Sequence, residues 1–544
     1  MDKELDQFFT QIIREKWKGD PVSATFLGIH DYDDQMGNYD KHAQIELIEK
    51  AKGHLAQLKT YEGKPSLSSD QEIDLKILIT QLEVEIRLFE QAQMLFRNAT
   101  VYPYTCLYGI YSLLIREFAP LEQRLENLLS RLNKVPKVLK EGQNNLSEGR
   151  EIPRIWTEIA LEVTEAGINF FQTQIPEVSK EYPKIGGQIQ QANSAAIEAL
   201  KRYHIFLKHD VLPKAVENFA MGREMFNFLL QTEHLLPYSV DGLIALGREF
   251  IAQTEQAMQE IAKEIDPKKS WREIVTELKE DYPPGEGLIH LYQEKMRAAR
   301  EFVRTKDLVT IPASEILRIS ETPLFERPTT PYAAYLPPPP FDQKPEGIFW
   351  VTPVDLHASE EKQLDQLRGH NRRGAAIVAL HEAYPGHHLQ LSRANEVHSL
   401  VRKQYESTVF VEGWALYCEE MMFEVGFYQD PATRLLQLKD QLWRSCRVVI
   451  DASIHSHVMS FHDAVRMLID VADLEKTNAQ AEVKRYSISP TQPMSYMVGK
   501  KQILELREKI RKLKGKDFSL KDFHDRLLSF GSIPISLIEP LMLS

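Results

Sequence analysis

The stretch Ala379–Gln390 constrains this 544-residue chain more than any other, because it places three histidines and one glutamate within eight positions around a proline. A His-Glu pair followed by a further histidine is the usual way in which a helix offers zinc two nitrogen ligands and a general base. In the usual H-E-x-x-H spacing the histidines are four residues apart and share one helix face. Here that fourth position is Pro385, so a regular helical turn does not complete the site.

The distance along a straight helix shows what the chain must do instead. His388 follows His381 by seven residues and would lie about 10 Å further along the axis. One metal with bonds of about 2.0–2.1 Å to nitrogen does not bridge that distance. The proline disfavours helical angles at Tyr384, whereas Gly386 accepts almost any backbone conformation. We therefore predict a bulge between these two residues that lets His387 replace the ligand at the fourth position, with His388 as the alternative.

A second apolar helix is expected at residues 410–420, and Glu412 lies near its start. Glu412 follows His387 by 25 residues, which leaves room for a loop and a returning helix. Two histidines and one glutamate, with a fourth position open to water, form a common catalytic zinc site. We predict that His381, His387 and Glu412 bind zinc. Glu419 falls on the same helix face and would either orient a ligand histidine or be an ordinary solvated glutamate.

Polar groups further along the chain offer additional chemistry. Tyr486 and Tyr496 flank a proline-containing turn, and phenols are suitable donors to a developing oxyanion, although such tyrosines more often pack at the edge of a core. Other polar residues follow one face of an expected helix at spacings of three and four: Arg444, Arg447, Asp451 and His455. Such a ladder is more typical of a salt-bridged helix face. The functional alternative is that Asp451 braces a metal ligand.

Hydrophobic residues recur at helical spacing over most of the first 300 residues. We expect helices there at residues 70–96, 121–132, 159–174, 192–211 and 240–265. Prolines lie mostly near the ends of these segments. Because this part carries little recognisable chemistry, we interpret residues 1–310 as a helical scaffold and cleft wall.

The composition changes from about Pro312 to Pro353, where frequent prolines exclude a long helix. Ala333–Leu336 and Gly347–Thr352 have the apolar, aromatic and β-branched character of strands. These strands would either line the cleft, where one could pair with an extended peptide, or form a structural hairpin over the helical body. We expect residues 311–544 to form the catalytic half, with this β element and the zinc-site helices.

Charge and composition narrow the classes of partner. The formal charge of −12 and the absence of a basic run argue against a nucleic-acid partner. No run approaches 18 apolar residues, and the N-terminus opens with charged residues, so we expect no membrane partner and a cytoplasmic location. The three cysteines are far apart, so a disulfide framework is not expected.

These stretches together resemble the bacterial DUF885 family. The resemblance rests on H-E-A-Y-P-G-H-H-L-Q at 381–390, V-E-G-W-A-L-Y-C-E at 411–419 and R-Y-S-I-S-P-T-Q-P-M-S-Y at 485–496. The early segment Ala24–Tyr32 fits as well, so the resemblance covers nearly the whole chain. It implies a zinc peptidase.

A remoter similarity connects the chain to the helical gluzincin peptidases, such as angiotensin-converting enzyme, thimet oligopeptidase and the thermostable carboxypeptidases. By that similarity Glu412 corresponds to the third zinc ligand and Tyr496 to the oxyanion tyrosine, while Tyr486 falls where the angiotensin-converting enzymes keep a second donor, a histidine. The chain departs from the pattern by two extra residues within 383–386. Dipeptidyl peptidase III accommodates one extra residue there. The absence of a G-x-M-E-N stretch counts against the gluzincin aminopeptidases.

The sequence therefore predicts a mainly α-helical protein with a large gluzincin-like body around a deep cleft and a small β element. The predicted function is that of a zinc metallopeptidase acting on short peptides, of the carboxypeptidase, dipeptidase or oligopeptidase type. Glu382 would be the general base, and Tyr496, with Tyr486 as a second donor, would stabilise the oxyanion. The alternatives are a zinc hydrolase of a non-peptide amide or ester, and a helical binding protein that holds no metal.

Overall fold

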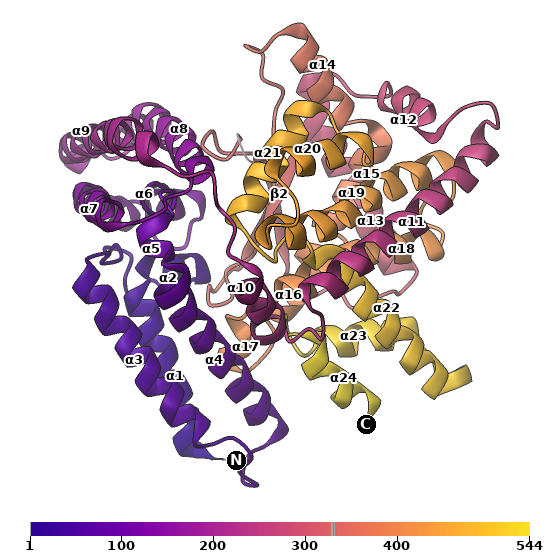
Figure 1. The fold of residues 1–544 in the computed structure, drawn as a ribbon, viewed down its shortest axis with the longest axis horizontal. Coiled ribbons are helices and arrows are strands. Elements are labelled where there is room, and N and C mark those ends of the chain that lie inside the picture. The colour runs from indigo at the N-terminus through magenta and orange to yellow at the C-terminus, as the bar shows by residue number, and fades with distance from the viewer. Residues whose placement is uncertain (1, 328–329, 331) are drawn as a thin grey trace. The chain divides into compact units, whose positions relative to one another are not determined.

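The structure is a computed structural model that describes residues 2–327, 330 and 332–544. These residues form mainly α-helices together with one small β-sheet (Figure 1). The mainly helical fold class with a small β element, predicted from the sequence, is confirmed. Within the described residues, no helix combines the length and the apolar character that a membrane crossing requires.

The chain folds into two compact units. The first contains Met1–Phe219 and two short later segments, Pro339–Lys344 and Ser399–Gln404. The second contains the rest of the chain, Ala220 onward, apart from those two segments. All the residues singled out above as ligands, base or oxyanion donors belong to the second unit.

The units separate after Phe219, and not between residues 310 and 311 as we expected from the sequence. Residues 220–310 belong with the later part of the chain because α11 (Val240–Ile265) packs along α19 (Pro431–His455). The proline-rich change near residue 312 marks a switch from helices to strands. A switch from helices to strands and a boundary between compact units can produce the same change in amino-acid composition.

The first unit is mainly helical, with an isolated parallel β-bridge between Pro153 and Val216. The bounds of its helices are α1 Lys3–Gly19, α2 Pro21–Leu27, α3 Lys41–Lys59, α4 Ser69–Arg87, α5 Met94–Arg97, α6 Val101–Ile115, α7 Leu121–Glu148, α8 Arg154–Lys180, α9 Pro183–Phe206 and α17 Leu400–Lys403. The helix expected at 121–132 continues to Glu148, and Pro176 lies inside α8 and not at its end. The segment expected as one helix over 70–96 changes to a π-helical turn after Arg87.

The second unit contains the sheet and the remaining helices. Besides α11 and α19, its helices are α10 Arg223–Phe228, α12 Trp271–Lys279, α13 Leu288–Thr305, α14 Glu360–Gly369, α15 Arg372–Glu382, α16 His387–Ala394, α18 Thr408–Glu424, α20 Phe461–Asp470, α21 Lys476–Ile488, α22 Ser495–Lys514, α23 Leu520–Leu528 and α24 Ile535–Leu543. The helix predicted at residues 240–265 has those same bounds in α11. One apolar core joins α11, α18, α19 and α22.

Three strands form the sheet, in the order β1-β3-β2. The central strand β3 (Glu346–Val351) is buried over almost its whole length and pairs parallel with β1 (Ile316–Glu321) and antiparallel with β2 (Ala333–Leu336). In the antiparallel register Ala333 lies opposite Val351. Both strands predicted from the sequence are present, although β1 was not expected. Because β2 is an edge strand, its outer side is not used by the sheet.

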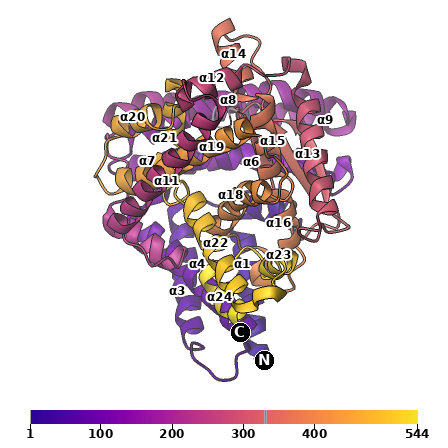
Figure 2. The ribbon, with the colours of Figure 1, turned by 90° about the vertical axis from the view of Figure 1, so that its right-hand side faces the viewer.

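Helices α18 and α22 cross at unusually close range, and this crossing positions two of the predicted functional residues (Figure 2). A Cβ on Gly499 would lie 1.9 Å from the carbonyl oxygen of Val409, and one on Gly413 would lie 2.4 Å from the Cα of Gly499. Glycine is therefore required on both helices at the crossing. Glu412 immediately precedes Gly413, and Tyr496 lies one turn before Gly499. Two backbones in contact thus fix both side chains.

Replacing Gly499 with alanine is expected to destabilise the second unit by about 1–3 kcal/mol or more, because the added methyl group forces the two helices apart. Thermal unfolding would measure the shift. Gly187→Ala is the matched control, since Gly187 is exposed within α9 and no atom lies within 4 Å of an added Cβ. The control should be neutral or slightly stabilising. Equal unfolding temperatures for Gly499→Ala and the unaltered chain would contradict the tight crossing.

Candidate metal centre

The histidine-rich stretch is a helix interrupted by a four-residue loop. Helix α15 ends at Glu382 and α16 begins at His387. The peptide bond before Pro385 is cis, and the Gly386 N–H donates a hydrogen bond back to the last turns of α15 at 3.0 Å. A Cβ on Gly386 would lie 1.7 Å from the carbonyl oxygen of His381, so a side chain is excluded there. The predicted bulge is confirmed, and it is a full interruption of the helix.

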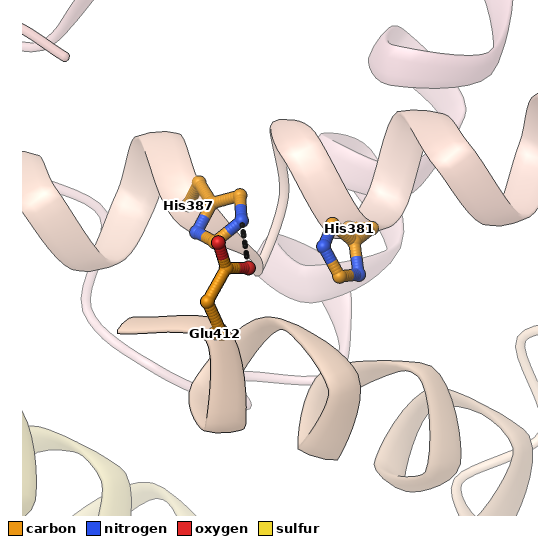
Figure 3. Close-up of side chains that lie close together, drawn as sticks. All are labelled: His381, His387 and Glu412. Carbon is orange, nitrogen blue, oxygen red and sulfur yellow. Dashed lines mark ion pairs between the residues drawn. The ribbon is translucent and has the colours of Figure 1, made fainter. Parts of the chain in front are cut away.

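The interruption brings the ring of His387 next to that of His381. The two imidazole rings lie edge to face with their centroids 4.9 Å apart. Glu412 of α18 completes the group, with its Oε2 atom 3.3 Å from His387 Nε2 (Figure 3). One donor atom from each of the three residues lies within 4.8 Å of the others. The structure therefore brings together the three residues that the sequence predicts as zinc ligands.

Glu419 contacts one of these histidines from behind. Its Oε1 atom lies 2.8 Å from His381 Nδ1, and its side chain is completely buried. A hydrogen bond at Nδ1 fixes the orientation of the ring and leaves Nε2 available for a metal. Gln437 donates a further hydrogen bond to Glu419 Oε2 at 3.3 Å. Of the two possibilities weighed for Glu419, the structure shows the partner of a histidine and not a solvated glutamate.

His388 points to a different set of groups. Its Nε2 atom lies 2.6 Å from Glu315 Oε2, and its Nδ1 atom lies 2.8 Å from the hydroxyl of Tyr335. Both ring nitrogens are thus occupied by neighbours outside the group formed by His381, His387 and Glu412. His387 is the histidine that joins the group.

The carboxyl groups of the site differ in their protonation behaviour because their surroundings differ. Burial raises the pKa of Glu382 to about 7. Burial also acts to raise the pKa of Glu412, but the adjacent imidazole of His387 reverses the effect and the pKa falls to about 2. Burial holds the pKa of His381 well below its usual value. The arrangement thus favours an ionised Glu412 and a neutral His381, as metal ligands need. Burial acts to lower the pKa of His387, but the adjacent carboxylate of Glu412 outweighs it and the pKa is raised.

Tyr496 lies beside this group, on the first turn of α22. Gln492 joins the two, because its Nε2 atom donates at 3.2 Å to both Glu412 Oε1 and the Tyr496 hydroxyl. The ring of Tyr496 lies nearly parallel to that of His381, with centroids 6.4 Å apart. The guanidinium carbon of Arg447 lies 4.7 Å from the centroid of the Tyr496 ring. A phenol and a permanent positive charge therefore stand next to the three clustered residues.

Tyr486 is placed differently from what we expected. It is fully buried, and its hydroxyl accepts hydrogen bonds from Arg447 Nε at 2.9 Å and Trp443 Nε1 at 3.2 Å. It lies behind Arg447 and does not line the cavity described next. Of the two tyrosines predicted as oxyanion donors, Tyr496 lines the cavity and Tyr486 does not. The ten-residue spacing did not show that α21 ends between the two tyrosines and turns Tyr486 inward.

Asp451 supports the backbone next to the site and does not contact a histidine of the cluster. Its two carboxylate oxygens accept hydrogen bonds from the N–H groups of Thr491 and Met494. These residues form the turn that leads into Tyr496. Of the expected ladder, the described residues show the contact between Asp451 and His455 at 3.9 Å, whereas Arg447 pairs at 3.2 Å with Glu482 of α21.

The cluster opens onto a cavity of about 470 Å³ within the second unit. Its lining includes His381, His387, Glu412, Glu382 and Tyr496, which are the predicted ligands, base and first oxyanion donor. Strand β2 contributes its residues to the same wall. Of the two predicted strands, β2 thus lines the cavity, whereas β3, its antiparallel partner, contributes no residue to the lining.

Comparisons with other proteins place the whole chain in one family. The profile of the bacterial proteins of unknown function DUF885 matches residues 21–542. The chain belongs to the DUF885 family. No match is found among curated proteins.

Two solved structures share the fold of this DUF885 protein. A "putative lipoprotein of unknown function" from Shewanella oneidensis is 25% identical, with a TM-score of 0.81 over 99% of this chain and 100% of the other. A "putative lipoprotein" from Colwellia psychrerythraea is 19% identical, with a TM-score of 0.83 over 99% and 98% of the two chains. These two structures thus share the fold of this chain, and the comparisons leave its activity open.

The DUF885 cavity also contains residues that the sequence did not single out as functional. Lys439, Arg444 and Arg447 line it from α19, and Tyr335 lines it from β2. One sequence feature could have indicated Lys439, Arg444 and Arg447: they are cations on a helix whose other residues are strongly apolar. Such cations are either paired in the interior or directed into a cavity. Tyr335 belongs to a strand that was expected as a possible cleft wall, but the sequence did not indicate that its hydroxyl meets a histidine 53 residues later.

Proposed function

We propose that this DUF885 protein is a zinc-dependent hydrolase that cleaves peptide bonds in short peptides. The observation that carries the proposal is the convergence of His381, His387 and Glu412 on one point beside Glu382, at the wall of a cavity. Two nitrogen ligands and one oxygen ligand, with a carboxylate next to them, are the donor set of catalytic zinc in hydrolases.

The separation of His387 from Glu412 matches that of two ligands on one zinc ion. Two atoms bound tetrahedrally at about 2.0–2.1 Å lie roughly 3.3 Å apart, and His387 Nε2 and Glu412 Oε2 are 3.3 Å apart. Glu412 Oε2 is buried and makes no hydrogen bond among the described residues, and its polar neighbour is His387 Nε2, the other predicted ligand atom. Buried polar atoms without a hydrogen bond are rare and costly, and an ion shared with His387 Nε2 accounts for this one. The Glu419 contact to His381 is the support that ligand histidines commonly have.

Each side chain around the cluster has a part in hydrolysis. Zinc, when bound, supplies Lewis acidity and lowers the pKa of water. Glu382 removes a proton from the attacking water and returns it to the leaving amine, as a carboxylate with a pKa near neutrality can do. Tyr496 donates its hydroxyl hydrogen to the oxygen that gains negative charge, and Arg447 adds a permanent positive charge close by.

Strand β2 supports peptides as substrates over other amides and esters. It lies at the edge of the sheet and lines the cavity, so an extended peptide can continue the sheet by backbone hydrogen bonds. A cavity of about 470 Å³ accommodates a few residues and excludes a folded protein. The cytoplasmic location expected from the sequence stays a prediction, and the two solved neighbours carry lipoprotein names.

The metal is tested first. Purified chain reconstituted with zinc and dialysed should retain about one zinc per chain by elemental analysis. His387→Ala should lose it, because one of three ligands is removed. His388→Ala is the matched control and should keep it, since that ring is bonded to Glu315 and Tyr335. Retention of zinc by His387→Ala with loss by His388→Ala would show that the ligand is assigned wrongly. No zinc in a normally folded chain would favour the metal-free binding protein.

The base is tested by Glu382→Gln, which keeps the size of the side chain but cannot accept the proton. Peptide hydrolysis should fall by about 10²–10⁴-fold while zinc content and fold remain unchanged. Steady-state turnover of short peptides and metal analysis on the same sample separate the two effects. Turnover close to that of the unaltered chain would remove Glu382 from the mechanism, and loss of zinc would make it a ligand.

The oxyanion donor is tested by Tyr496→Phe. A group that donates only as charge develops stabilises the transition state more than the substrate, so kcat and kcat/KM should both fall by roughly 10²–10³-fold, with KM little changed. Tyr486→Phe is the comparison and should have a weaker effect, because its hydroxyl holds Arg447 and does not reach the cavity. A rise in KM at constant kcat for Tyr496→Phe would mean that the hydroxyl binds substrate in the ground state instead.

A further inference from the structure

The cavity contains one lysine whose charge the protein does not neutralise. Lys439 of α19 lines the cavity and is only 9% exposed, and within the described residues its ammonium group makes no hydrogen bond and no ion pair. Its situation differs from that of other cations in the same wall. Lys279 pairs with Glu475 at 3.1 Å, and Arg485 pairs with Glu482 at 3.0 Å.

An unpaired ammonium in a cavity wall is unfavourable unless an anion joins it. Burial lowers the pKa of Lys439, and the charge of Lys279 acts in the same direction. The acidic groups Asp440, Asp473 and Glu475 act against this, yet none of them lies at ion-pair distance from Lys439. Lys439 is thus a cationic position with room for an external anion.

We propose that Lys439 binds the free C-terminal carboxylate of the peptide substrate, so that the enzyme cleaves close to the C-terminal end. The proposal rests on the proposed peptidase function and narrows it to substrates with a free carboxyl terminus. An acidic side chain of the substrate offers the same carboxylate chemistry, and the experiment below separates the two sources.

Lys439 and the cluster line the same cavity, whose volume is about 470 Å³. A cavity of this size holds a few residues of an extended peptide, each of which advances the chain by about 3.3–3.4 Å. A carboxylate at Lys439 therefore lies within a few residues of the bond to be cleaved.

Arg444 itself adds to the attraction for an anion. It lines the same cavity, and its Nε atom is buried without a hydrogen-bond partner in the described part of the chain. Its Nη1 atom donates only to the backbone carbonyl of Asp440, at 3.1 Å. Arg444 is thus a second cation of the same helix in the cavity wall, although Asp440 of that helix also lines the cavity.

The test measures peptide binding, so that it does not depend on turnover. Three N-acetylated tetrapeptides would be titrated calorimetrically into the zinc-loaded Glu382→Gln chain: a neutral sequence with a free C-terminus, the same sequence with a C-terminal amide, and an amide that ends in glutamate. The free acid should bind about tenfold or more tightly than the neutral amide, as expected for a hydrogen bond to a charged group. Adding Lys439→Met should remove that difference, and adding Lys439→Arg should retain most of it.

Matched variants guard against a structural explanation. Lys476→Met removes an exposed lysine outside the cavity lining and should leave the difference intact. Lys439→Met should unfold at the same temperature or higher, because an unpaired charge is replaced by an apolar side chain of similar length. A marked loss of thermal stability would show that the lysine has a structural partner and would overturn the proposal.

The outcomes separate this proposal from the proposed function. The assignment of Lys439 would be overturned if the free acid and the neutral amide bind equally or not at all. It would also be overturned if Lys439→Met weakens the binding of both peptides equally. Tight binding of the glutamate amide that depends on Lys439 would overturn the C-terminal assignment in favour of an acidic side chain. Discrimination that depends on Lys439, in a protein whose unaltered chain hydrolyses no peptide, would support carboxylate recognition and remove the peptidase function alone.

Discussion

The candidate centre depends on the hydrogen bond that Trp414 Nε1 donates to the carbonyl oxygen of Pro385 at 2.8 Å. The proline belongs to the loop that separates the two histidine-bearing helices, and Trp414 belongs to the helix that carries Glu412. Both groups are buried, so neither is satisfied by solvent and the bond is costly to break. One contact thus fixes the loop, and with it His387, against the helix that supplies the third member of the cluster. A loop held in this way replaces the regular helical turn that Pro385 excludes.

The charges behind the cluster are arranged to keep it rigid. Glu419 holds His381, and the next residue, Glu420, pairs with Arg434 at 2.7 Å and Lys500 at 2.9 Å. These contacts tie α18 to α19 and α22, the helices that provide Arg447 and Tyr496. Buried ion pairs contribute little net stability, because desolvation offsets their attraction. Their effect here is to fix the rotation of α18 about its axis, and a ligand group must be held to within a fraction of an ångström.

Sequence reasoning was accurate where the chemistry is local and inaccurate where it depends on packing. The strand at Ala333–Leu336 and the interruption after Glu382 follow from residue types within a few positions, and both were predicted. The separation of units after Phe219 depends on α11 packing along α19, across nearly 200 residues of sequence, and no local pattern records it. Strand β1 was missed because its apolar and polar residues do not alternate regularly along the sequence. Its pairing with β3 is a contact between distant segments that a local pattern does not show.

The tyrosines show the same limit in the site itself. Spacing placed Tyr486 and Tyr496 at either side of a turn, but the partner that decides their direction comes from α19. The Nε atom of Arg447 donates to the Tyr486 hydroxyl at 2.9 Å, and its guanidinium group then faces the ring of Tyr496. Tyr486 therefore acts on the cavity through Arg447, as a support that fixes a cation beside the first phenol. In the proposed reaction the second positive influence on the oxyanion comes from a guanidinium group, which stays charged at any pH at which the fold survives.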